Sequence, residues 1–250
     1  MQGLRSAIFY LGLVVPTVAF ALLAIIIWPL PLRVRQPIIS RWSVFALYWL
    51  RLTCGVDWRI HGMEKLNGPP AVILCKHQSA WETIALCGLF PPQVWVLKRE
   101  LFFVPAFGQA LAALAPIAIS RGQGSKALRQ VITQGVDRIR RGMWVVIFPE
   151  GTRVAPGASG RYARSGAQLA VAAGCQVFPV AHNAGLCWPR SSFIKQAGMI
   201  DVIVGDPIDS TGLSAAEITR RCESWIESTS RSLLPAGHHG SDVQADSESQ

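Results

Sequence analysis

The hydrophobic pattern divides the chain into a long apolar start and a longer region of alternating character. Residues 7–30 contain no charged side chain. A helix over this run reaches roughly 36 Å, enough to cross a bilayer hydrocarbon core of about 30 Å. The run is too long for a secretory signal, and no small-x-small cleavage site follows it. A membrane anchor is therefore favoured over a cleaved signal peptide.

A second apolar stretch, residues 37–54, is interrupted by Arg41 and Arg51. It is expected to form a second membrane-associated helix, and two geometries remain open. Either the first helix spans the bilayer and the second lies at the interface, or both form a hairpin in one leaflet with both ends cytoplasmic. A buried core helix is the less favoured alternative, because the first run is uninterrupted.

From residue 56 onward, short apolar runs alternate with helical periodicity, as in α/β proteins. Strands are expected at 56–62, 71–76, 94–98, 116–120, 144–149, 176–182 and 199–205. Helices are expected at 81–89, 105–114, 125–141 and 165–173. A capping box of Ser214 and Glu217 opens a last helix to about residue 233.

These elements predict an α/β fold, in which a mixed central sheet is flanked by helices and preceded by an N-terminal membrane-associated helical segment of one or two helices. The expected domains are N-terminal anchoring helices in residues 1–55, an α/β domain in 56–234 and a disordered polar tail in 235–250.

Charge and composition agree with membrane association. Only 16% of residues are charged, against about 25% in average proteins, and the net charge is +9. Residues 1–55 contain five arginines and no acid. Such a segment favours the cytoplasmic side and anionic headgroups. A nucleic-acid partner is not expected, since no dense basic run with interleaved aromatics occurs. The six cysteines form no CxxC pair, which favours reduced core residues.

The turn after the strand at 71–76 carries the first candidate chemistry. His77 at a strand end can act as a base, and Glu82 could orient its ring if His77 precedes the following helix. The structural alternative is a capping box, in which Glu82 reaches back to the Ser79 amide. The sequence alone leaves both readings open.

Two further turns contain charged residues after apolar strands. Lys98 and Arg99 follow one strand and could bind a phosphate or form a solvated cluster, and Arg121 is a similar candidate after the strand at 116–120. The segment 148–153 reads Phe-Pro-Glu-Gly-Thr-Arg, in which Gly151 permits an unusual backbone angle and Arg153 can grip a phosphate. A turn with a Glu–Arg ion pair is the alternative there.

In this order, the motifs resemble the glycerolipid acyltransferase family, specifically the bacterial 1-acylglycerol-3-phosphate acyltransferases. The first block is His77 with an acid five positions on, and the third is matched in full by 148–153. The second block is Lys-x-Glu-Leu-x-x-x-Pro-x-x-Gly, matched by Lys98, Glu100, Leu101, Pro105 and Gly108. The fourth block is the Pro-Val strand at 177–180. Two departures are Glu82, where the family more often has Asp, and Arg164-Ser165-Gly166, where a lysine-rich element is usual.

The resemblance implies transfer of a fatty acyl group from acyl-CoA or acyl carrier protein to the free hydroxyl of 1-acylglycerol 3-phosphate, with phosphatidic acid as product. It implies His77 as catalytic base oriented by Glu82, with no covalent acyl-enzyme. In the implied acceptor site, the phosphate is bound by Lys98, Arg121 and Arg153. The remainder of the acceptor pocket is formed by Glu150, Gly151 and Thr152.

The implied partners are the lysophospholipid, the acyl donor and membrane lipids, and no cofactor or metal is expected. The implied location is the inner membrane, with the active site facing the cytoplasm. Alternative acceptors are glycerol 3-phosphate or a lyso aminolipid. A remote alternative is a metal-dependent hydrolase using His77, Glu82 and His182.

Overall fold

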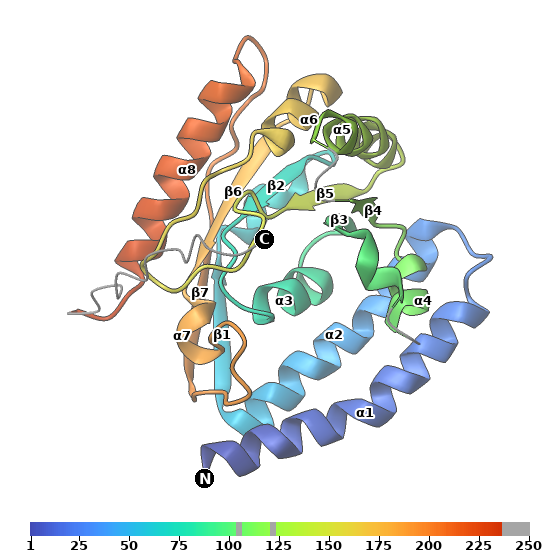
Figure 1. Cartoon of the computed structure of the whole chain (residues 1–250), viewed down its shortest axis with the longest axis vertical. Coiled ribbons are helices and arrows are strands. Elements are labelled where there is room, and N and C mark those ends of the chain that lie inside the picture. The colour runs from blue at the N-terminus through green and yellow to red at the C-terminus, as the bar shows by residue number, and fades with distance from the viewer. Residues whose placement is uncertain (104–106, 121–123, 237–250) are drawn as a thin grey trace.

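The computed structural model describes residues 1–103, 107–120 and 124–236 (Figure 1). The chain begins with two helices, α1 (Gln2–Ile26) and α2 (Leu32–Cys54), joined by a short turn. The strands are β1 (Val56–His61), β2 (Val72–Cys75), β3 (Gln93–Lys98), β4 (Ile117–Ile119), β5 (Trp144–Ile147), β6 (Val177–His182) and β7 (Gly198–Val204). The other helices are α3 (Trp81–Leu89), α4 (Phe107–Ala112), α5 (Gly124–Arg140), α6 (Ser165–Ala173), α7 (Ala184–Cys187) and α8 (Ala215–Ser232), with short 3₁₀ turns η1 (Met63–Asn67) and η2 (Arg99–Phe103).

The seven strands form one mixed sheet in the order β1-β7-β6-β2-β5-β3-β4. All neighbouring pairs are parallel except β6 and β7. The predicted α/β class with a mixed sheet is therefore confirmed. β2 lies at the centre, where Leu74 pairs with Pro179 on one side and Ile147 on the other. The residues that follow β2 consequently lie in the middle of the sheet edge.

Alternate residues of β2 serve two separate hydrophobic cores. Ile73 and Cys75 face a core shared with α2 and α3, whereas Val72 and Leu74 face a core shared with α5, α6 and α8. A strand buried on both faces must be apolar throughout, and this explains the sequence Val-Ile-Leu-Cys. Figure 1 shows α3, α2 and α1 in successive layers on one face of the sheet and α5, α6 and α8 on the other.

The two N-terminal helices differ in burial. Among the described helices, α1 is the one that is long and apolar enough to cross a membrane, and only 17% of its most apolar window is buried. One face of α2 is buried against α3, including Ala46, Leu47 and Leu50, and the association of α2 with a membrane stays a prediction. The opposite face of α2 remains exposed at Tyr48 and Leu52. The two helices do form a hairpin, as Figure 1 shows.

Most of the expected elements are present with ends shifted by a few residues. Ser214 caps α8 as expected, since its Oγ accepts the Glu217 amide at 3.2 Å. The segment after β3 was predicted as a turn, and within it residues 99–103 form the short 3₁₀ turn η2. Gly108 then packs so closely on the Phe102 carbonyl that no Cβ would fit there. Of the expected polar tail, 235–250, the residues from 237 onward lie outside the described ranges.

Candidate active site

The turn between β2 and α3 brings His77 and Glu82 together. His77 Nδ1 lies 2.8 Å from Glu82 Oε1, and Glu82 is buried while the His77 side chain is 15% exposed. This contact forms because His77 precedes α3 and Glu82 occupies its first turn. The same Oε1 accepts the amides of Gln78 and Ser79 at 2.9 and 2.8 Å. The two readings of this turn are therefore compatible, because one carboxylate caps the turn and contacts the histidine.

Glu82 is held in its ionised form. Burial acts to raise the pKa of Glu82, but the His182 ring and the hydrogen bonds from His77 and Ser79 keep that pKa below its usual value. An ionised carboxylate requires His77 to donate from Nδ1, which leaves Nε2 as the acceptor nitrogen of a neutral ring. No hydrogen bond to Nε2 is made by another residue in the described ranges. The Phe148 ring stacks on His77, with centroids 4.1 Å apart, and limits its rotation.

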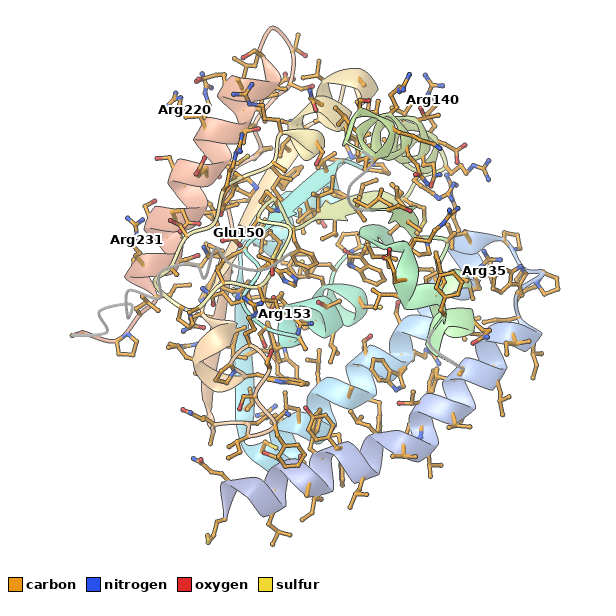
Figure 2. The ribbon with its side chains drawn as sticks, in the orientation of Figure 1. Arg35, Arg140, Glu150, Arg153, Arg220 and Arg231 are labelled. Carbon is orange, nitrogen blue, oxygen red and sulfur yellow. The ribbon has the colours of Figure 1, made fainter. Side chains whose placement is uncertain are left out.

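The Glu-Gly-Thr-Arg segment lies against the same histidine. Glu150 Oε2 accepts the His77 backbone amide at 2.9 Å, and the Val154 amide donates to the His77 carbonyl at 2.8 Å. Gly151 adopts a φ of +66°, a left-handed conformation that favours glycine. The alternative reading of this turn, a Glu150–Arg153 ion pair, is wrong, because Glu150 points inward and Arg153 projects beside the start of α3 (Figure 2).

Glu150 belongs to a buried charge network that sequence reasoning missed. Lys76 Nζ lies 2.7 Å from Glu150 Oε1 and 2.7 Å from Glu227 Oε1 of α8, and donates to the Ala158 carbonyl at 2.9 Å. The Tyr162 hydroxyl donates to Glu227 Oε1 at 2.8 Å. Burial raises the pKa of Glu150, and Lys76 opposes that shift. The network ties the 150–164 segment and α8 to Lys76, which lies between the end of β2 and His77.

The other expected site residues are Lys98, Arg121 and Thr152. Lys98 ends β3, and nothing is described of its side chain. Arg121 lies outside the described residues. Thr152 is exposed in the turn after Glu150.

His182, a ligand in the hydrolase alternative, is buried with both ring nitrogens engaged. Its Nδ1 accepts the Ala184 amide at 3.2 Å, so its Nε2 donates to the Lys76 carbonyl at 2.8 Å. Within the ranges that the structure describes, no group of three His, Cys, Asp or Glu side chains is arranged to hold a metal ion. The histidine–carboxylate pair therefore has no third ligand there.

Residues 57–183 match the family described as Acyltransferase, and the chain belongs to this family. It is 42% identical over 240 residues to the 1-acyl-sn-glycerol-3-phosphate acyltransferase of Pseudomonas aeruginosa, covering 94% of this chain and 93% of that protein. It is 26% identical over 214 residues to the lyso-ornithine lipid O-acyltransferase of the same species, covering 78% of each chain.

The fold is also that of a solved structure. The crystal structure of the 1-acyl-sn-glycerophosphate acyltransferase PlsC from Thermotoga maritima superposes with a TM-score of 0.79, covering 93% of this chain and 95% of that one. The two chains share 20% sequence identity, so this likeness establishes the fold alone.

Proposed function

We propose that this protein transfers a fatty acyl group from acyl-CoA or acyl carrier protein to the free hydroxyl of 1-acylglycerol 3-phosphate, which yields phosphatidic acid. The observation that carries the proposal is the His77–Glu82 pair: its Nε2 has no hydrogen-bond partner among the described residues, and the His77 backbone is bonded to Glu150 and Val154 on either side of Arg153. Membership of the acyltransferase family supports the reaction class. The 42% identity to a relative named for this reaction supports the acceptor.

In this mechanism His77 Nε2 takes the proton of the acceptor hydroxyl as its oxygen attacks the thioester carbonyl. Glu82, ionised and fixed by two backbone amides, stabilises the imidazolium that forms. Collapse of the tetrahedral intermediate breaks the carbon–sulfur bond, and the imidazolium returns its proton to the departing thiolate. General-base assistance of this kind contributes about 10²–10⁴ in rate.

The acceptor phosphate is assigned to Arg153, with Lys98 and Arg121 as further contacts. In the part of the chain that the structure describes, no side chain pairs with the Arg153 guanidinium, so it is available to a ligand. Glu150 and Gly151 act by shaping the turn, since Glu150 is committed to Lys76 and to the His77 amide. The enzyme would work at the inner membrane with its site facing the cytoplasm, and the exposed apolar surface of α1 supports membrane contact.

An acceptor panel tests the function. Purified protein in detergent is given acyl-CoA or acyl carrier protein with lysophosphatidic acid, glycerol 3-phosphate or a lyso aminolipid. Phosphatidic acid as the main product is the expected result. Turnover of the lyso aminolipid alone would retain the reaction class and overturn the phosphate assignment, and transfer to no acceptor would refute the proposal.

Replacing Arg153 with alanine is expected to raise the KM for lysophosphatidic acid by about 10- to 100-fold, because a charge-assisted hydrogen bond to phosphate is worth about 1.5–3 kcal/mol. The KM for the acyl donor should change little. Arg161→Ala is the matched control, since Arg161 is an exposed arginine of the same segment. Equal effects of the two substitutions would contradict a specific phosphate contact.

Replacing Glu82 with glutamine is expected to lower kcat by about tenfold or more, because a neutral amide no longer stabilises the imidazolium. The backbone amides of Gln78 and Ser79 can still donate to the glutamine oxygen, so the turn should persist. Steady-state kinetics with unchanged circular dichroism is the measurement. A kcat equal to that of the wild type would assign Glu82 to capping alone.

A further inference from the structure

A groove opens beside the histidine–carboxylate turn. Its volume is 320 Å³, at the lower end of the range of about 300–1,000 Å³ for ligand pockets. It is lined by eight residues: Tyr10, Ala80, Arg153, Trp188, Pro189, Ser191, Ser192 and Phe193. Ala80 lies three residues after His77. Arg153 directly precedes Val154, whose amide donates to the His77 carbonyl. The groove therefore adjoins the turn that carries the proposed base.

The aromatic walls of the groove come from outside the part of the chain that matches the family. That match ends at residue 183, whereas Tyr10 belongs to α1 and Trp188 and Phe193 follow α7. The Tyr10 and Phe193 rings stack with centroids 5.2 Å apart, and Tyr10 meets Trp188 edge-on at 6.5 Å. These walls are features of this chain that the family motifs do not specify.

A buried lysine holds the two walls together. Lys195 Nζ lies 3.8 Å from the centroid of the Tyr10 ring and 4.4 Å from that of Trp188. It donates to the Phe193 carbonyl at 2.7 Å and to the Tyr10 hydroxyl, while its backbone amide donates to Ser6 Oγ at 2.9 Å. A cation that is removed from water is attracted to aromatic faces, so these contacts fix the positions of Tyr10, Trp188 and Phe193 relative to one another.

The groove is amphipathic, with a cation near the proposed base and aromatic side chains elsewhere. The Arg153 guanidinium has no partner among the described side chains, and an anionic group would satisfy it. Tyr10 lies on α1, where Leu11, Val14 and Val15 are exposed to the surroundings. An apolar ligand chain in the groove therefore continues onto the surface that is suited to contact lipid.

We propose that this groove is the entry site of the acceptor, which binds with its phosphate at Arg153 and its acyl chain against Tyr10, Trp188 and Phe193. This inference rests on the proposed function, because that function supplies a monoacyl lipid with an anionic head. The aromatic walls then select the chain of the acceptor, whereas the acyl donor does not contact them.

Photolabelling tests the site without requiring turnover. A lysophosphatidic acid with a diazirine in its acyl chain is irradiated with the full-length protein in detergent, and labelled peptides are identified by mass spectrometry. Labels on the peptides containing Tyr10 or Trp188–Phe193, removed by excess unlabelled lysophosphatidic acid, are expected. Labelling that excess lipid does not remove would reflect contact with bulk lipid and would overturn the proposal, whether or not the acceptor panel shows turnover.

A matched pair of variants provides a second readout. Phe193→Ala should raise the KM for the acceptor that the wild type uses by about tenfold and leave the donor KM unchanged. Ile194→Ala is the control, because Phe193 and Ile194 are 53% and 42% exposed but only Phe193 lines the groove. Equal effects of the two variants, or equal changes in both KM values, would overturn the proposal. Phe193→Trp, which keeps an interfacial aromatic but narrows the groove, should affect long-chain acceptors most.

Discussion

Replacing His77 with alanine is expected to lower kcat for acyl transfer by about 10²–10⁴-fold while the protein remains folded. The ring is the group in the turn with an acceptor nitrogen open to a substrate hydroxyl, since Nδ1 is committed to Glu82. The backbone of His77 carries the contacts that organise the site, to Glu150 and Val154, and alanine retains them. The measurement is single-turnover acyl transfer at saturating substrates, with circular dichroism as the test of folding.

His61→Ala is the matched control for this prediction. His61 ends β1, its side chain is 59% exposed, and its nearest acid is Asp201 at 3.8 Å. It should retain wild-type activity. The double variant His77→Ala with Glu82→Gln should be no worse than His77→Ala alone, because residues that act as one unit are not additive. A His77→Ala protein with more than about a tenth of wild-type kcat would refute the general-base assignment.

The local elements of the fold follow from the sequence because their patterns are short-range. The charge-free run of residues 7–30 and the run Val-Ile-Leu-Cys of β2 each predict one element almost without alternatives. The strand order cannot be predicted from the sequence in this way. β1 pairs with β7, which lies more than half of the chain away, and local periodicity contains no information about which distant strands pair. The packing partner of α2 does not follow from the sequence for a related reason: its buried stripe faces α3, which only the tertiary structure brings close.

The site was predictable where its parts are adjacent in sequence. His77 and Glu82 occupy one turn, so their meeting depended only on where α3 begins. The partners of Lys76 were not predictable in the same way. Glu227 lies 151 residues from Lys76, and the signal that marks it is its position beside Ile226 on the buried stripe of α8. An acid on that stripe requires a partner, but the sequence does not identify which one.

The buried network around Lys76 leads to the largest expected effect on stability. Replacing Lys76 with methionine removes the cation between Glu150 and Glu227 and leaves two buried carboxylates without their shared partner. Removing one member of a buried ion pair typically costs about 3–5 kcal/mol, so the free energy of unfolding should fall by about that amount. The measurement is the midpoint of denaturant unfolding in detergent, with the wild type in parallel.

Two comparisons isolate the cause of that loss. Lys65→Met removes a lysine that pairs with the exposed Asp206 at 2.8 Å, and a surface pair is worth about 0–1 kcal/mol. In the double variant Lys76→Met with Glu227→Gln, the second buried charge is neutralised, and Tyr162 can still donate to the amide oxygen. This variant should recover part of the lost stability. If Lys76→Met destabilises the protein no more than Lys65→Met does, the network is not the electrostatic support of the His77 turn. The hydrogen bonds of the His77 backbone to the Glu150 carboxylate and the Val154 amide then hold that turn by themselves.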